Sequence, residues 1–439
     1  MSTRIVTINV SQTISGTPSG LQQMSALVSA GMTNLSPGVP ALLTESSDLS
    51  DILGLTPVSF AVRENGESYL AMLGISEGMT SFAVGDSVEI TTTGFTPEAL
   101  NGTWTAQLAS ENIIIWDISA SSTDVEVIGT FSIKNNVTSL EIAADEFFAQ
   151  GSSVGVYVIE LGSGLTVPEQ ISALKKYIDE PLKRFYAYYV PRSWDGDADF
   201  ISLAKLHTSD ESMLYFFVVT DTPTDPNYVS PYAGIKSVIA TADPSYPDTN
   251  AAVAAMWNFV SAAPSEVNKV PPMAFRFLQA VNAHPGKNSI LKRMQNQNIN
   301  YVDTGAEGGI SNTILVKGVT SDGNDMTYWY SVDWVQINAN MALANAVING
   351  SNNPINPLYY DQDGVDRLQL VAQGVFDTGG SYGLVNGAPV VNAIKFKTYV
   401  KNNPNDYAKG RYAGLSATYT PMRGFTEIVF NINVTMQLS

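Results

Sequence analysis

The last residues of the chain alternate apolar and polar side chains with a strict period of two. Every second position from 430 to 438 is apolar, namely Phe430, Ile432, Val434, Met436 and Leu438. Residues 4–14 follow the same rule, with Val6, Ile8 and Val10 on one face. This period predicts a strand with one buried face at each end of the chain. Because chain ends fray unless something pairs with them, we predict that both strands pair with another chain.

Between Phe60 and Thr130 short β-rich runs alternate with turns rich in Gly, Asn, Ser and Pro. The predicted strands are residues 68–73, 87–93, 103–108, 112–118 and 124–131. Many short strands at this spacing are typical of a small sandwich or barrel. We therefore expect an all-β domain inserted into a larger one.

From about residue 150 onward, strand patterns alternate with helix patterns. Strands are predicted at 155–161, 185–190, 213–220, 235–241, 299–303 and 312–319, and helices at 166–178, 198–207, 250–263 and 289–297. The first of these helices opens with a capping box, Thr166 to Glu169, and has Pro168 in its first turn. Alternating strands and helices predict an open α/β sheet with crossover helices.

Several weaker patterns complete the prediction. The pattern of residues 21–31 predicts a short helix that ends near Gly31. Further helices are expected at 334–348, stopped by Asn349-Gly350, and at 365–376, stopped by Gly379-Gly380, with strands at 391–399 and 413–420. The fold class is thus an α/β (α+β) core sheet flanked by helices, with an inserted all-β domain and extended strand arms at both termini.

These patterns divide the chain into five segments. They are an N-terminal strand arm at 1–20, the first part of the core at 21–59, an inserted acidic β-rich domain at 60–145, the α/β core at 146–424, and a C-terminal strand arm at 425–439. The first ten residues contain one basic residue and no long apolar run, so we expect no signal peptide. No stretch approaches the 18 consecutive apolar residues of a membrane-spanning helix.

Charge changes this picture in two places. The 439 residues include 41 acidic and 23 basic ones, for a net charge of −18, which argues against nucleic acid or an anionic membrane as a partner. Within 60–130 there are ten acidic residues against Arg63 alone, a local net charge of −9, so we expect the inserted domain to face solvent. There is no cysteine, which excludes disulfides, thiolate metal sites and thiol catalysis.

Residues 390–423 are basic instead. Against Asp406 alone they contain Lys395, Lys397, Lys401, Lys409, Arg411 and Arg423, a local net charge of +5. A cluster of one sign on a chain of the other sign is typical of a docking face for an acidic partner, or for acidic parts of a neighbouring copy. An ordinary solvated pair of strands is an equally good interpretation.

Motifs for nucleotide binding fail on spacing. Gly162-Ser-Gly164 lies between a predicted strand and a helix, but a dinucleotide fingerprint needs a third glycine where Val167 stands. Gly286-Lys287 lacks both the earlier glycine and the following Ser or Thr of a phosphate loop. We therefore expect no nucleotide and no other cofactor.

Candidate metal and catalytic groups are few. Two acidic runs have the composition of calcium loops, Asp195 to Asp199 and Asp361 to Asp366, but neither has both the glycine and the glutamate that an EF-hand needs. The simpler interpretation is that Asp197 or Asp363 caps the helix that follows. Ser–His–Asp catalysis would need His207 or His284, and no nucleophile-elbow motif surrounds a plausible serine. We expect no metal site and no catalytic site.

These features together indicate a self-assembling structural protein. The stretch Tyr419-Thr-Pro421-Met-Arg423-Gly-Phe-Thr-Glu427-Ile-Val-Phe430, which continues into the 431–438 strand, resembles the end of the core in contractile-tail sheath proteins of myovirus-type bacteriophages. The likeness covers residues 1–20 and those from about 150 onward, whereas 60–130 has no counterpart in it.

The resemblance implies hexameric rings stacked helically around a tail tube, with strand arms exchanged between copies and a sheath that contracts to drive the tube through the host envelope. The implied partners are the chain itself and the tail tube, baseplate and tail terminator proteins, in a virion tail assembled in the host cytoplasm, with neither nucleic acid nor membrane. The six basic residues of 390–423 would face the tube. Two alternatives stay open: another virion structural protein (tail tube, baseplate or adhesin subunit), and a carbohydrate-active enzyme that uses carboxylates such as Asp195 and Asp199.

Overall fold

The computed structural model describes residues 20–53, 59–65, 68–74, 85, 87–96, 98–110, 113–118, 130–162, 165–306 and 310–426. The predicted terminal strands, with Val6, Ile8, Val10, Phe430, Ile432, Val434, Met436 and Leu438, lie outside these residues. The chain forms two compact units. Among the described residues, unit 1 comprises Gly20, Pro264–Lys269 and Ser331–Met422, and unit 2 comprises 21–263, 270–330 and 423–426.

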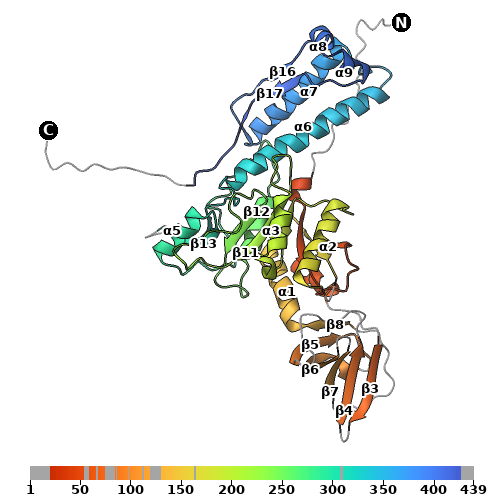
Figure 1. Ribbon diagram of the computed structural model, residues 1–439, viewed down its shortest axis with the longest axis vertical. Coiled ribbons are helices and arrows are strands. Elements are labelled where there is room, and N and C mark those ends of the chain that lie inside the picture. The colour runs from red at the N-terminus through yellow and green to blue at the C-terminus, as the bar shows by residue number, and fades with distance from the viewer. Residues whose placement is uncertain are drawn as a thin grey trace, which may run out of the picture. The chain divides into compact units, whose positions relative to one another are not determined.

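Unit 2 is built on an eight-stranded sheet (Figure 1). Its strands, in spatial order, are β14 (Ile310–Val316), β13 (Asn300–Ala306), β12 (Val238–Ala242), β11 (Tyr215–Thr220), β10 (Ala187–Tyr189), β1 (Ser25–Ser29), β9 (Val156–Glu160) and β2 (Pro40–Leu43). The strands from β13 to β9 pair in parallel, and the outer pairs β13–β14 and β2–β9 are antiparallel. The mixed α/β architecture expected from the alternation of strands and helices is therefore present.

Helices cover both faces of this sheet, because successive side chains of a strand point to opposite sides. Phe216 and Val218 of β11 share a core cluster with residues of α2 (Val167–Asp179) and α3 (Ala198–Lys205). Phe217 of β11 instead contacts Phe259 of α4 (Ala251–Val260), with 5.7 Å between ring centroids. The capping box at Thr166 and the buried helix after Asn250 are confirmed.

The helix predicted at 21–31 is wrong. A short 3-10 turn, η1 (Leu21–Gln23), leads into strand β1. All five residues of β1 are buried, and the strand pairs in parallel with both β9 and β10. A slot in the middle of a parallel sheet requires burial on both faces, and this overrides a local pattern that fits a helix equally well.

A six-stranded antiparallel sheet lies in the sequence between β2 and β9 of the core sheet. Its order is β3 (Ser59–Asn65), β4 (Ser68–Gly74), β7 (Ile113–Ile118), β6 (Gly102–Ser110), β5 (Ser87–Thr93) and β8 (Thr130–Ile133). Strands β4 to β7 lie where the sequence predicted them, and aromatic side chains such as Phe95 and Trp116 pack in the interior. The sheet is followed by α1 (Lys134–Ala149), which buries Phe147.

Unit 1 holds most of the two longest helices. These are α6 (Met326–Asn352), whose first five residues belong to unit 2, and α7 (Gln362–Ser381). Short elements complete the unit: the paired strands β15 (Val385–Asn386) with β18 (Thr420–Pro421), the paired strands β16 (Val391–Ala393) with β17 (Leu415–Ala417), and the helices α8 (Phe396–Asn402) and α9 (Pro404–Ala408). The helix α5 (Asn288–Asn296) belongs to unit 2.

Several boundaries predicted in this region are wrong, including the start at 334 of a helix that in fact begins at Met326. Gly350 does not stop a helix but lies inside α6, and a Cβ there would come within 2.3 Å of Leu358 Cβ. Gly379 likewise lies inside α7, where a Cβ would be 2.8 Å from Val385 Cγ2. These glycines permit close packing, a role that in sequence is indistinguishable from a helix stop. The predicted strand 391–399 ends at Ala393, and its second half begins α8.

Candidate functional site at the carboxyl edge of the parallel sheet

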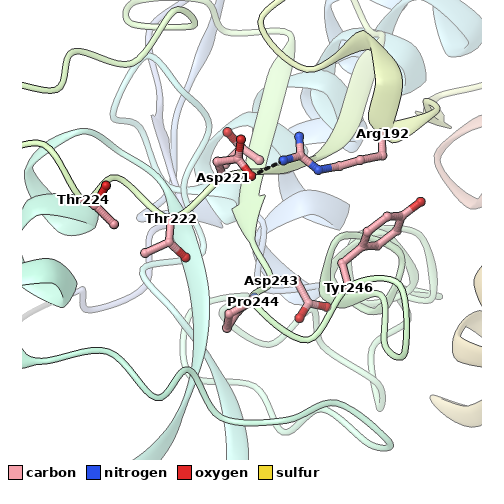
Figure 2. A pocket seen from close by; sticks show the side chains of 8 residues that line it. Arg192, Asp221, Thr222, Thr224, Asp243, Pro244 and Tyr246 are labelled. Carbon is pink, nitrogen blue, oxygen red and sulfur yellow. Dashed lines mark hydrogen bonds and ion pairs between the residues drawn. The ribbon is translucent and has the colours of Figure 1, made fainter.

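A polar cavity of about 450 Å³ opens where strands β10, β11 and β12 end (Figure 2). In open α/β sheets, ligands bind at this carboxyl edge. The lining residues are Arg192, Thr220, Asp221, Thr222, Thr224, Asp243, Pro244 and Tyr246. Arg192 and Asp221 point toward one another and form an ion pair, and Asp243 and Tyr246 lie across the cavity from them.

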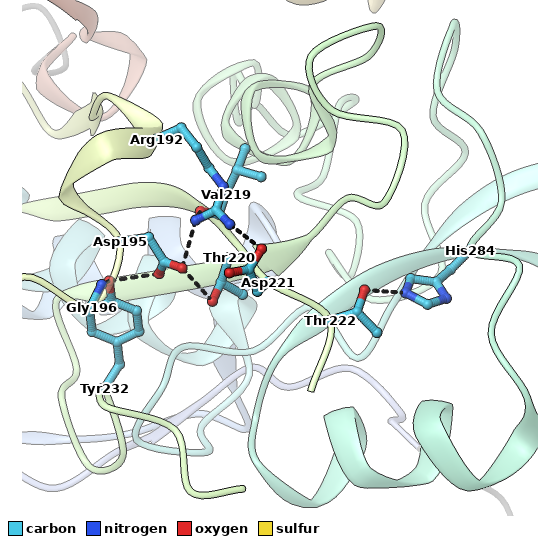
Figure 3. A network of polar contacts seen from close by, with 9 residues as sticks. All are labelled: Arg192, Asp195, Gly196, Val219, Thr220, Asp221, Thr222, Tyr232 and His284. Atoms are coloured by element: carbon cyan, nitrogen blue, oxygen red, sulfur yellow. Dashed lines mark hydrogen bonds and ion pairs between the residues drawn. The ribbon is translucent and has the colours of Figure 1, made fainter. Parts of the chain in front are cut away.

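Asp195 is the centre of the polar network beside this cavity (Figure 3). Its Oδ2 accepts hydrogen bonds from Arg192 Nη1 at 2.6 Å and from Thr220 Oγ1 at 3.1 Å, and its Oδ1 accepts one from the Tyr232 hydroxyl at 2.9 Å. The Tyr232 oxygen in turn accepts from the backbone N–H of Gly196 at 2.7 Å. Each of these side chains therefore has a hydrogen-bond partner within the network.

The electrostatics fit a structural network. Burial opposes the charge of Arg192, yet the hydrogen bonds and charges of Asp195 and Asp221 raise its pKa above the ordinary value. Burial also raises the pKa of Tyr232, and the neighbouring Asp195 carboxylate adds to this. Both groups keep their protons across the accessible pH range. These hydrogen bonds join the turn after β10 to the carboxyl end of β11, at Thr220, and to the loop that contains Tyr232.

The second predicted carboxylate, Asp199, is not part of this network. Asp197 caps α3, as predicted, because its Oδ1 accepts from the backbone N–H groups of Asp199 and Phe200. The Asp199 side chain is exposed. Asp195 and Asp199 therefore have different environments, one engaged by three donors and one solvated.

His284 lies near the cavity with both ring nitrogens engaged. Nδ1 accepts a hydrogen bond from the Gly286 backbone N–H at 2.9 Å, and Nε2 lies 2.8 Å from Thr222 Oγ1. Since Nδ1 accepts, the neutral ring carries its proton on Nε2 and donates it to Thr222, so the ring is in the wrong tautomer to deprotonate that hydroxyl. Burial lowers the pKa of His284. His207 does not line the cavity, and burial lowers its pKa as well.

The site that sequence reasoning missed is the cradle around Glu160, the last residue of β9. This carboxylate is 2% exposed and accepts backbone N–H hydrogen bonds from Gly31 at 2.6 Å, Gly162 at 2.9 Å and Thr33 at 3.2 Å. The hydroxyls of Ser29 and Thr33 donate to it at 2.8 Å each. A glutamate at the end of an otherwise apolar strand is the sequence signal that could have revealed it.

This cradle lies where a phosphate loop would be expected. The loops after β1 and β9 leave their backbone N–H groups pointing inward, which is how proteins bind phosphate. Here the chain's own carboxylate fills that place. Gly162, at φ +117°, serves this internal contact, whereas Ser163 and Gly164 of the predicted turn lie outside the described residues.

The acidic run 361–366 also has a structural role, although not the predicted one. Asp361, and not Asp363, caps α7 by accepting from the Gly364 backbone N–H at 2.8 Å. Asp363 lies two residues further on, inside the first turn. Within the described part of the chain, no group of three or more His, Asp or Glu side chains is arranged to hold a metal ion.

The basic residues of 390–423 divide between the two units. Five belong to unit 1: Lys395, Lys397, Lys401, Lys409 and Arg411, all exposed. Lys395 Nζ is 3.3 Å from Asp366, and Arg411 is 3.7 Å from Asp406. Arg423 belongs to unit 2, where its guanidinium lies over the ring of Tyr328 at 4.2 Å from the centroid.

Comparison with known proteins identifies a shared fold. No family model and no curated protein sequence matches the chain. Among solved structures, the chain is similar to one in the "Cryo-EM structure of the anti-feeding prophage (AFP) baseplate in contracted state", with a TM-score of 0.50, 10% sequence identity, and coverage of 98% of each chain. The likeness is therefore one of mixed α/β fold along nearly the whole chain. Among the described helices, none is both long and apolar enough to cross a bilayer.

Proposed function

We propose that this chain is a structural subunit of a bacteriophage-type contractile tail sheath, polymerising as helically stacked hexameric rings around a tail tube and contracting to drive that tube through the host envelope. The observation that carries the proposal is the fold likeness over 98% of both chains to a component of a contracted anti-feeding prophage baseplate. The interior also supports it, since the polar groups beside the cavity and around Glu160 hold the fold together.

The surface of unit 1 supports self-assembly. Nine of the 17 exposed large apolar side chains among the described residues lie in unit 1, although it is the smaller unit. They are Val267, Val347, Ile348, Ile355, Tyr359, Leu370, Val390, Ile394 and Tyr407. An excess of exposed apolar surface marks a region that a partner covers.

The proposed linkage between copies is strand exchange. The alternating segments 4–14 and 427–438 would add strands to sheets of neighbouring copies, a mode that relies on backbone hydrogen bonds and so tolerates diverse side chains. In unit 1 the described strands form two-stranded sheets, β15 with β18 and β16 with β17, and sheets this short have edges that an added strand can complete. Contacts of this heterologous kind that do not close generate helical assemblies.

Charge suggests the orientation. We propose that the exposed basic side chains of unit 1, Lys395, Lys397, Lys401, Lys409 and Arg411, face the tube, and that the acidic 60–130 segment faces outward. Contraction would then move the cores as rigid bodies while the strand linkages hold, with the energy stored in a kinetically trapped extended packing. No nucleotide is needed for such a step.

A baseplate subunit is the second candidate, because the similar chain belongs to a structure described as a baseplate. The two candidates differ in what the purified chain forms. A sheath subunit gives long, hollow, striated cylinders by negative-stain microscopy, whereas a baseplate subunit gives only complexes of fixed size. Long cylinders would support the first candidate and exclude the second.

The exchange of the C-terminal strand is tested by its apolar face. Replacing Ile432, Val434 and Met436 with Asn should abolish cylinder formation while leaving a folded monomer by circular dichroism and sedimentation. The matched control replaces Asn431 and Asn433 with Thr, which changes the other face and keeps the strand propensity. Unchanged polymerisation of the triple variant would refute arm exchange.

A further inference from the structure

The origin of the C-terminal segment is held on unit 2 by a compact set of contacts, here termed the C-terminal clasp: Arg423 and Gly424 against Asn324, Asp325 and Tyr328. The Arg423 guanidinium lies over the Tyr328 ring at 4.2 Å from the centroid, and its Nη2 donates to Asn324 Oδ1 at 3.1 Å. A guanidinium that is stacked and hydrogen-bonded at once is fixed in direction as well as in place.

The second half of the clasp is the carboxylate of Asp325, which is 4% exposed. Its Oδ1 accepts from the backbone N–H groups of Thr327 at 2.6 Å and Tyr328 at 3.2 Å, in the first turn of α6. Its Oδ2 accepts from the backbone N–H of Gly424 at 3.2 Å. One buried carboxylate thus joins the start of α6 to the last residues before the C-terminal segment.

Gly424 is required for this approach. A Cβ on Gly424 would lie 2.8 Å from Pro272 Cβ, closer than real Cβ contacts come. The backbone can therefore reach Asp325 only because position 424 has no side chain. The residue before the clasp, Met422, is also held, because its backbone N–H donates to the Leu384 carbonyl oxygen at 2.9 Å within unit 1.

We infer that the clasp positions the C-terminal arm: Arg423 and Gly424 fix the place and direction of the chain just before residues 427–439, so that capture of the arm by a neighbouring copy costs less conformational freedom. The inference rests on the proposed strand exchange for its purpose. A segment whose first residues are already ordered pays less entropy when it adds to another sheet. Arg423 thereby has a role different from that of the basic residues in unit 1.

The clasp is tested on the full chain by spin-label distances, which the absence of natural cysteines makes simple. Labels are placed at Thr426→Cys and at Lys205→Cys, both exposed positions in unit 2, and the chain is mixed with excess unlabelled protein. We expect a narrow distance distribution. Arg423→Ala should broaden it, and Gly424→Ala should do so without any change of charge.

The control is Lys409→Ala, which removes the same charge from an exposed position in unit 1. It should leave the distribution narrow. Melting curves for all variants separate release of the clasp from unfolding of the core. An unchanged distribution in Arg423→Ala, or equal broadening in Lys409→Ala, would overturn the inference.

Polymerisation distinguishes failure of the clasp from failure of the proposed function. If the arm is exchanged, Arg423→Ala should raise the critical concentration for polymerisation without a tube about tenfold, since fewer free chains present the arm correctly. A broadened distribution with an unchanged critical concentration would contradict the purpose assigned to the clasp while leaving its contacts established; arm exchange itself fails only if the variant with Asn at 432, 434 and 436 still polymerises. An unchanged distribution would refute the clasp whatever the chain assembles into.

Discussion

The backbone N–H of Gly31 donates a 2.6 Å hydrogen bond to Oε1 of Glu160, across the carboxyl ends of neighbouring strands β1 and β9. This contact joins two loops that would otherwise present unpaired donors to a buried space. It places a carboxylate of the protein itself where a related fold would hold the phosphate of a ligand. Glu160 thereby supplies the acceptor for buried donors of both loops at the carboxyl edge of the sheet.

We predict that Glu160→Ala destabilises the protein by about 3 kcal/mol or more. The variant leaves several buried donors of Gly31, Thr33 and Gly162 without their acceptor, and each unsatisfied donor costs about 1–3 kcal/mol. Urea unfolding followed by tryptophan fluorescence measures the loss. Glu180→Ala, at an exposed position, should change the stability by less than about 0.5 kcal/mol and serves as the control. Similar midpoints for the two variants would contradict the role given to the cradle.

A matched pair of glycines in α7 tests the close packing in unit 1. Gly379→Ala should destabilise the protein by about 1–3 kcal/mol, because the new Cβ would lie 2.8 Å from Val385 and 3.1 Å from Trp334. Gly374→Ala, in the same helix, has no heavy atom within 4 Å of the new Cβ and should stabilise by up to about 1 kcal/mol through helix propensity. Thermal melts of both variants give the signs. Effects of the same sign would show that packing does not explain Gly379.

Glu146 makes the stability of unit 2 depend on pH. Burial raises the pKa of Glu146 from 4.5 to about 7, and the nearby carboxylates of Asp243 and Asp145 add to the effect. Because the pKa is higher in the folded protein, the stabilising contribution is complete below about pH 4.5 and is lost as the pH rises through 7. Glu146→Gln should therefore leave the melting temperature nearly unchanged near pH 4 and raise it near pH 8.

The size of this effect follows from the shift in pKa. A rise of that size corresponds to about 3 kcal/mol between the two limits. Glu98→Gln, at an exposed position, is the control and should shift the melting temperature little at either pH. A parallel pH profile for wild type and Glu146→Gln would rule out Glu146 as the source.

The polar network beside the cavity predicts that Asp195 and Asp199 contribute differently to the free energy of unfolding. Asp195→Asn should destabilise by about 2 kcal/mol, since it weakens the charge-assisted bond from Arg192 and disturbs those from Thr220 and Tyr232. Asp199→Asn, at an exposed position, should be nearly neutral. Polymerisation of both folded variants should match the wild type. Loss of a glycoside-cleaving activity in both variants would instead favour the carbohydrate-active alternative.

The sequence was sufficient to predict an element wherever the residues that determine it lie within one short stretch of the chain. The capping box at Thr166 and the cap at Asp197 depend on residues within a single turn, and both are present. The alternation of strands and helices after residue 150 reflects burial directly, and so it predicted an open α/β sheet with crossover helices. The strands β4 to β7 were predicted for the same reason.

Distant residues decided the rest. Ser25–Ser29 became a strand because β9 and β10 enclose it. Gly350 and Gly379 permit the close approach of Leu358 and Val385, which fold back on their helices from a few residues further along the chain. The Glu160 cradle and the C-terminal clasp each join residues about a hundred positions apart or more. Hydrophobic period and capping are local and can be read along the chain, whereas close approach and the pairing of buried polar groups arise only when segments far apart in sequence meet.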